Sequence, residues 1–266
     1  QDPAERLFLH GRWHEGLVPQ LGVTAPDRGQ IDGFLSRMQR LRDHRGADGR
    51  PGFSIPLDRS SRDPELLALD QISFGTWLRH EGYTAAPLLW YVNYCCRDDF
   101  GLPADRVSAW AGLHYFAARH GEAANASGHA VLTWPEGNGW LVRRLRDPLG
   151  GRVRTGCAVF RVEERNGGVV VDVFDGTARE SVRITADRVV LATPDYVTQR
   201  LLAAAGDGPS GRRPVYAPWM VANLTLDALP AGRGAALAWD NVWYDSPSLG
   251  YIVATHQALD PVPRAT

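Results

Sequence analysis

The sequence has 266 residues, of which 44% are hydrophobic and 22% charged, as in an ordinary globular protein. Because 29 basic residues are balanced by 30 acidic ones, the net charge of −1 argues against a nucleic-acid-binding domain. No apolar run is long enough to span a bilayer, and no signal peptide follows Gln1. We expect a soluble protein, cytoplasmic or periplasmic, and an internal piece of a longer chain.

The first half of the chain is predicted to be mostly helical. Apolar residues recur at helical spacing from Ile31 to Leu41, and Ser73 can cap a helix that contains Phe74. Leu88 to Phe100 is rich in aromatic residues, and a further helix is expected from Ser108 to Arg119. This part of the chain is a candidate for a substrate-covering domain.

Several aromatic residues in and just after this half are candidates for a pocket that takes an apolar or ring-bearing substrate, with plain core packing as the alternative. They are Trp90, Tyr91, Tyr94, Trp110, Tyr115 and Trp134. Asp98 and Asp99 form a carboxylate pair that either does acid–base work or simply ends a helix beside Arg97.

Cysteine and histidine spacing predicts neither a disulfide framework nor a metal site. Cys95 and Cys96 are adjacent, and with Cys157 they make only three cysteines. We expect the adjacent pair to be buried small residues. The chain has no CxxC or HExxH spacing, so the eight histidines do not predict metal ligands.

A glycine turn and an amphipathic helix are predicted next. Gly137 and Gly139 flank Asn138, and all three tolerate positive φ, so the chain can turn sharply there. Leu141 to Leu149 places apolar residues at helical spacing, and Gly150-Gly151 is expected to end the helix.

Three strands of a β-meander are expected after this helix. Val153 to Val162 is predicted to be a strand, with Gly156 as a possible bulge. Asn166-Gly167-Gly168 predicts a hairpin turn into the β-branched strand Val169 to Phe174. A second turn then leads to a third strand around Ile184.

The run from Arg188 to Ala192 has a different character. It is continuously apolar after Arg188 and does not alternate, as expected of a strand covered on both faces in a parallel sheet. Thr193-Pro194-Asp195 breaks this strand and opens a helix that carries Val197 and Leu201.

This order of elements resembles the middle of the flavin-dependent amine oxidase superfamily, which includes monoamine oxidases, protoporphyrinogen oxidases and phytoene desaturase-like enzymes. These proteins share a glycine turn before a helix, a V-x-x-V strand, a meander and a strand that ends in Ala-x-Pro. The matching segments here are Gly137 to Gly139, Ala158 to Val162, Val169 to Ile184, and Leu191 to Pro194.

The resemblance implies FAD as the cofactor. It implies that the backbone N–H and C=O of Val159 contact the adenine, and that Ala192, Thr193 and Pro194 lie near the flavin. The glycine turn, with Gly137 and Gly139, is also expected to contact the cofactor. The substrate candidates are Trp134, Glu136, Tyr94 and Trp90.

The predicted fold class is α/β, or mixed α+β: an incomplete FAD/NAD(P)-binding fold with a largely helical substrate domain and a β-meander. We expect residues 1–130 to form the substrate or cap domain and residues 131–208 to form part of the FAD-binding domain. Residues 209–266 are expected to return to the substrate domain as strands, at Val215 to Thr225, Leu237 to Val242 and Tyr251 to Thr255.

Two features depart from the superfamily's pattern. Its N-terminal strand, glycine loop and helix, which hold the pyrophosphate, are absent, as is the segment that closes over the isoalloxazine. Gly206 to Gly211 matches G-x-G-x-x-G literally but follows a helix and contains a proline, so we expect a surface loop.

Two hypotheses about function remain open. The first is an FAD-dependent oxidoreductase that moves a hydride from a C–N or C–C bond of a small-molecule substrate to flavin, with N- and C-terminal segments of the same protein as partners. The second is a non-catalytic binding module derived from a flavoprotein fold.

Overall fold

The computed structural model describes residues 4–119, 134, 136–165, 167–202, 214–228 and 232–254. The chain divides into two units, which are treated separately below. Unit 1 comprises Gln1–Pro135 together with Ala217–Thr266, and unit 2 comprises Glu136–Tyr216. Within the described residues, no helix is long and apolar enough to cross a membrane. The domain boundaries expected after residues 130 and 208 stay a prediction.

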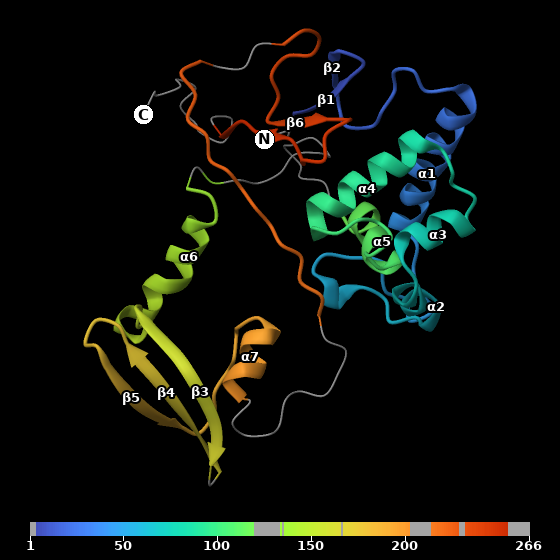
Figure 1. The fold of residues 1–266 in the computed structure, drawn as a ribbon. Helices are drawn as coiled ribbons and strands as arrows, with labels where there is room; N and C mark the ends of the chain where they lie inside the picture. The colour runs from blue at the N-terminus through green and yellow to red at the C-terminus, as the bar shows by residue number, and fades with distance from the viewer. Residues whose placement is uncertain are drawn as a thin grey trace. The chain divides into compact units, whose positions relative to one another are not determined.

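Unit 1 consists of a group of helices and a four-stranded sheet (Figure 1). Its α-helices are α1 (Ala25–Asp43), α2 (Pro64–Ala68), α3 (Phe74–His80), α4 (Ala86–Phe100) and α5 (Ala109–Ala117). Two short 3-10 helices are η1 (Leu57–Arg59) and η2 (Leu69–Gln71). Its strands are β1 (Glu5–Leu9), β2 (Arg12–Glu15), β6 (Asp240–Trp243) and β7 (Tyr251–Ile252).

The helices begin where local capping chemistry places them. The Thr24 hydroxyl accepts a hydrogen bond from the backbone N–H of Asp27 at the start of α1. Ser73 caps α3 in the same way, as the sequence predicted. At the other end of α4, Gly101 adopts a left-handed conformation with φ 67°, which terminates the helix.

The helical core is built from apolar residues that recur on one face of each helix. α5 packs on α1 and α3. The side chains of Phe34, Phe74, Leu88 and Leu113 are fully or almost fully buried there. Phe34 lies edge-on to Phe116 at a centroid distance of 5.2 Å, which is a favourable aromatic geometry.

The sheet of unit 1 joins the two ends of the chain in the order β2-β1-β6-β7. β1 pairs antiparallel with β2 through the His10-Gly11 turn, where both residues have positive φ. β1 also pairs in parallel with β6, which lies more than 200 residues later. The buried guanidinium of Arg6 donates hydrogen bonds to the Asn241 side chain and the Ala235 carbonyl, and so fixes this pairing.

Unit 2 consists of helices α6 (Gly139–Arg146) and α7 (Asp195–Leu202), the 3-10 segment η3 (Asp147–Arg152) and a three-stranded meander. The strands are β3 (Cys157–Arg165), β4 (Gly168–Asp175) and β5 (Glu180–Ala186), in the order β3-β4-β5. α7 packs against β3 (Figure 1). The predicted meander and its hairpin are confirmed, because Arg165 pairs with Gly168 across the turn.

The bulge in β3 lies at a different place from the one predicted. Gly156 is in the turn before the strand, with φ 71°, whereas the register shift falls between Val159 and Arg161. Phe160 is therefore the extra residue on the bulged strand. The positive φ of Gly156 belongs to the turn that leads into β3 and not to a bulge within the strand.

The buried strand predicted from Arg188 to Ala192 is absent. This segment forms neither helix nor strand, and the side chain of Val190 is 91% exposed. A buried parallel strand needs ladder hydrogen bonds from neighbours, and no described strand pairs with this segment. The apolar run is present in the sequence, but its partners are not among the described residues.

The predicted C-terminal strands are only partly correct. Val215 to Thr225 is not a strand, and within it Met220 is 93% exposed. The strand expected at Leu237 to Val242 starts later, at Asp240, and the strand expected at Tyr251 covers only two residues of the described chain. Thr255 and the Gly206 to Gly211 loop lie outside the described residues.

Two helical glycines provide a test of the core. A Cβ added at Gly112 in α5 would lie 2.2 Å from a ring carbon of the fully buried Phe74, whereas one added at Gly33 in α1 would meet nothing within 4 Å. We expect Gly112→Ala to destabilise unit 1 by at least about 2 kcal/mol through overpacking. Gly33→Ala should stabilise it by about 0.5–1 kcal/mol through helix propensity. Denaturant unfolding of both variants measures this, and equal effects would contradict the described packing.

Candidate functional site

Val159, the residue expected to contact adenine, lies on β3 next to the bulge. It pairs with Val173 on β4, directly before the register shift. Its side chain is 42% exposed, while Val162 and Val173 are buried. β3 is an edge strand of the meander. A bulge on an edge strand leaves backbone groups without ladder partners, so this stretch of β3 offers a backbone donor and acceptor to a ligand.

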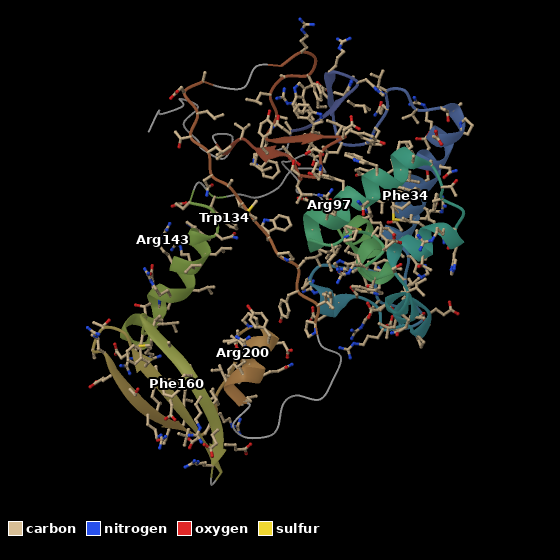
Figure 2. The ribbon with its side chains drawn as sticks, in the orientation of Figure 1. Phe34, Arg97, Trp134, Arg143, Phe160 and Arg200 are labelled. Carbon is tan, nitrogen blue, oxygen red and sulfur yellow. The ribbon has the colours of Figure 1, made fainter. Side chains whose placement is uncertain are left out.

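Phe160 and Arg161 follow Val159 on β3, at the bulge. Phe160 is 53% exposed (Figure 2). Arg161 lies opposite Asp172 in the register and Asp172 lies opposite Arg183, so charges of alternating sign cross the sheet. Arg183 donates two hydrogen bonds to Asp172, at 2.7 and 3.0 Å, and these bonds lower the pKa of the Asp172 carboxyl.

Ala192, Thr193 and Pro194 form an exposed connection that leads into α7. The Pro194 carbonyl accepts hydrogen bonds from the backbone N–H groups of Val197 and Thr198, at 2.9 and 3.0 Å, so Pro194 opens the helix. The sequence correctly predicted this helix start. The residues are small and their backbone is accessible, as the expected approach of a ligand requires.

Gly137 and Gly139 lie at the start of α6. Gly137 has φ 56°, and a Cβ added there would meet nothing within 4 Å. Glu136 forms an ion pair with Arg143 at 3.1 Å, and both side chains are about half exposed, at 48% and 46%. Glu136 is therefore held in an ion pair near the start of α6.

The two aromatic candidates on α4 are held in a stack. Trp90 lies between Tyr94 and Tyr244, with ring centroids at 5.7 and 4.6 Å. The indole N–H of Trp90 donates to the Tyr244 carbonyl at 3.0 Å. The Tyr94 hydroxyl lies 3.3 Å from both Asp240 Oδ2 and the Leu249 carbonyl. Burial raises the pKa of the Tyr94 hydroxyl above its ordinary value, so Tyr94 is a hydrogen-bond donor there.

Asp240 is a buried acid that the sequence analysis did not identify. Burial first, and then the negative charges of Asp98 and Glu5, raise the pKa of its carboxyl to about 6. No local signal marks it, because Asp240 stands between Trp239 and the polar Asn241. It is buried in the sheet in which β6 pairs with β1.

The remaining substrate candidates are divided between the two units. Trp134 belongs to unit 1 and Glu136 to unit 2. Asp98 and Asp99 are exposed near the end of α4. Desolvation and then the charge of Asp99 raise the pKa of Asp98. Among the residues the structure describes, no group of three or more His, Cys, Asp or Glu side chains is arranged to hold a metal ion.

The cysteines of α4 are buried and free, as expected. Burial raises the pKa of the Cys95 and Cys96 thiols to about 12, which keeps both protonated at neutral pH. Their side chains therefore pack in the core, and a protonated thiol is a poor nucleophile.

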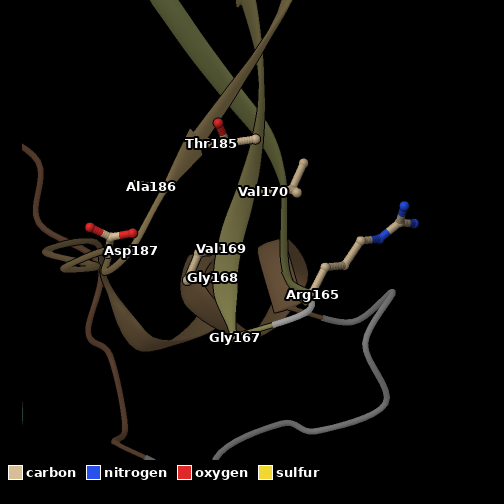
Figure 3. Close-up of a pocket in the computed structure, with 8 residues that line it drawn as sticks. All are labelled: Arg165, Gly167, Gly168, Val169, Val170, Thr185, Ala186 and Asp187. Carbon is tan, nitrogen blue, oxygen red and sulfur yellow. The ribbon is translucent and has the colours of Figure 1, made fainter.

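Each unit has a hollow on its surface. The one in unit 2 has a volume of about 270 Å³ and lies at the turn end of the meander, with Arg165 and Asp187 on its rim (Figure 3). The one in unit 1 has a volume of about 150 Å³ and is lined in part by His10, Asp27 and Tyr244. Neither hollow is lined by a residue expected to bind cofactor or substrate.

A comparison of the sequence with models of protein families shows the family of this chain. The sequence profile described as flavin containing amine oxidoreductase matches residues 10–218. The chain belongs to this family. The predicted relationship to flavin-dependent amine oxidases and the expected flavin cofactor, FAD, are thereby confirmed at the level of the family.

Solved structures of putrescine oxidase share the fold. The wild-type enzyme bound to putrescine is 18% identical with a TM-score of 0.51, and the match covers 75% of this chain and 42% of that one. A double mutant from the same redesign of cofactor binding is 20% identical, with a TM-score of 0.51 and coverage of 76% and 42%. The predicted mixed α/β fold class is confirmed. A search of curated proteins gives no significant match.

The chain thus spans less than half the length of the structures it matches. Two segments of unit 2 offer accessible backbone to a ligand: β3 beside its bulge, and the connection from Ala192 to Pro194. No strand–glycine loop–helix element for a pyrophosphate occurs among the described residues. The assignments of individual site residues stay predictions.

The half-exposed ion pair between Glu136 and Arg143 predicts a small contribution of Glu136 to stability. Exposed ion pairs and charges at helix ends contribute little to stability. We expect Glu136→Gln to lower the free energy of unfolding by less than about 1 kcal/mol, as measured by denaturant titration. Asp27→Asn, which removes a carboxylate from the first turn of α1, is the matched control. A loss above about 2 kcal/mol for Glu136→Gln would contradict the exposed geometry.

Proposed function

We propose that this chain is part of an FAD-dependent oxidoreductase that accepts a hydride from a C–N or C–C bond of a small-molecule substrate. The family match over residues 10–218 is the observation that carries the proposal. Flavin, when bound, supplies the hydride acceptor, and the protein supplies binding, orientation and electrostatics. Because the structures matched are putrescine oxidases, an amine is the first substrate class to test.

The cofactor contacts in this proposal come from unit 2. The backbone N–H and C=O of Val159 hold the adenine at the edge of β3. Ala192, Thr193 and Pro194 leave room for the flavin end, because they carry small side chains or open a helix. Gly137 and Gly139 let the chain turn at the start of α6 without a side chain in the way.

The substrate contacts in this proposal come from Trp90, Tyr94, Trp134 and Glu136. The aromatic rings offer flat apolar surface, and the carboxylate of Glu136 suits a cationic amine. The ion pair between Glu136 and Arg143 is half exposed, so a cationic ligand can compete for the carboxylate at little cost in stability.

The partners in this proposal are further segments of the same protein. Unit 2 leaves several large apolar side chains exposed: Leu145 at 74%, Val142 at 59%, Phe160 at 53% and Val190 at 91%. Exposed apolar surface on this scale marks an interaction site. No described strand pairs with residues 188–192. We therefore expect strands of the further segments to pair with this backbone on either side.

The alternative function is a binding module that has lost its cofactor. The observation in its favour is that the described residues hold no glycine loop for a pyrophosphate. The sequence upstream of Gln1 separates the two functions. A strand followed by a glycine fingerprint favours the enzyme, and a start codon directly before Gln1 favours the module.

The cofactor proposal is tested on the full product of the gene. We expect it to purify as a yellow protein with flavin absorbance. Val159→Pro removes the backbone N–H and should weaken flavin binding about tenfold, which corresponds to the loss of one hydrogen bond. Val159→Ala keeps the N–H and should bind flavin as the wild type does. Flavin affinity is measured by fluorescence titration of the apoprotein, with circular dichroism as the check on folding. A folded, colourless wild type that takes up no flavin would overturn the proposal.

A further inference from the structure

The turn between β6 and β7, residues 244–250, is called the strap here. Three side chains on one face of α4 donate hydrogen bonds to its backbone carbonyls. Trp90 donates to the Tyr244 carbonyl at 3.0 Å, and Tyr94 donates to the Leu249 carbonyl at 3.3 Å. Arg97 donates to the carbonyl of Pro247.

The spacing of these donors explains how one helix can hold the whole strap. Trp90, Tyr94 and Arg97 are four and three residues apart, so they lie on one face of α4. The strap needs such partners, because a turn of seven residues leaves carbonyl groups that β6 and β7 do not satisfy. The α4 face and the strap are therefore complementary.

The strap also covers the two aromatic substrate candidates. The ring of Tyr244 stacks on Trp90 at 4.6 Å with an interplanar angle of 28°. Tyr244 is at the same time a wall of the hollow of about 150 Å³, together with Leu9 and Pro87. If the strap moves away, the face of Trp90 that stacks on Tyr244 becomes accessible and the hollow loses this wall.

A buried acid lies beneath the strap. Asp240, at the start of β6, is 8% exposed and lies 3.3 Å from the Tyr94 hydroxyl, the same hydroxyl that holds Leu249. No ion pair of Asp240 with a basic residue occurs within the described chain. An ionised carboxylate in this position is buried without a compensating charge.

The charged groups that face Asp240 come from two elements. From α4 come the Tyr94 hydroxyl and the Asp98 carboxylate, and from β1 comes Glu5, which is its register partner. The adjacent residue on β1, Arg6, donates its hydrogen bonds to Asn241, Ala235 and Tyr251 instead. Both acids favour the protonated form of Asp240.

We propose that the strap is a pH-sensitive cover over Trp90 and Tyr94, closed while Asp240 is protonated and opened when Asp240 ionises. The proposed opening concerns unit 1 alone. Only its consequence for substrate access rests on the proposed function, because that function makes Trp90 and Tyr94 substrate contacts.

The direction of the effect follows from linkage. Burial raises the pKa of Asp240 to about 6 in the closed form, against 3.8 for an ordinary aspartate in the open form. The closed form is fully favoured below pH 3.8 and loses that advantage as the pH rises to about 6. The opening equilibrium should therefore increase about a hundredfold between pH 4 and pH 7.

Hydrogen exchange of the 266-residue chain tests this proposal. Peptides that cover residues 244–250 are followed by mass spectrometry from pH 4 to pH 7, after correction for intrinsic exchange. We expect protection to fall about a hundredfold over this range in the wild type. Asp240→Asn should stay protected at every pH. Asp245→Asn, which removes an exposed acid of the strap itself, should keep the pH dependence of the wild type.

Two other variants test the proposal if Asp240→Asn does not fold. Asp98→Asn should move the midpoint of opening to lower pH, because it removes one of the charges that disfavour ionisation. Tyr94→Phe should increase the opening equilibrium of the strap about tenfold at pH 4, because it removes the hydrogen bond to the Leu249 carbonyl. A wild type without pH dependence, or an Asp98→Asn midpoint that does not move, would overturn the proposal. Neither result bears on flavin binding, so the proposed function would stand.

Discussion

Pairing of the extended backbone is the constraint on which both units depend. Every strand that forms does so because another described strand satisfies its N–H and C=O groups. The meander meets this condition by itself, since β4 pairs with a neighbour on each side. The sheet of unit 1 meets it by bringing β6 back to β1, and Arg6 fixes that junction through Asn241. Where no partner strand is described, as at 188–192, the chain forms no strand.

The same constraint separates the features that the sequence could predict from those it could not. The caps at Thr24 and Ser73 and the hairpin that joins Arg165 to Gly168 depend on a few neighbouring residues. Local chemistry decides such features, and the predictions for α3 and for the meander were correct. The strand predicted from Arg188 to Ala192 was wrong because its existence depends on distant partners.

Two finer details needed three-dimensional information. The bulge was predicted at Gly156 because glycine tolerates positive φ, yet the register is decided by cross-strand pairing and slips at Phe160 instead. The buried acid at Asp240 was not predicted, because only the parallel pairing with Glu5 and the position of Tyr94 show that this carboxylate leaves water. Burial of a polar group follows from packing, which no short motif reports.

The candidate site follows the division of the chain. The residues proposed for the cofactor lie in unit 2, while Trp90 and Tyr94 lie in unit 1 under the strap. The chain belongs to the flavin-containing amine oxidoreductase family, and the proposed function assigns the first set to the cofactor and the second to the substrate. The chain spans 42% of the length of a putrescine oxidase of the same fold, so the proposal requires further protein segments to complete the site.

The central claim is that residues 188–192 find their strand partners in the larger flavoprotein. Hydrogen exchange of this segment, in the 266-residue chain and in the full gene product with flavin, tests it most directly. The account predicts rapid exchange in the chain alone and protection of at least about a thousandfold in the full product, as for a central strand. Rapid exchange in both, with the full product folded, would contradict the account.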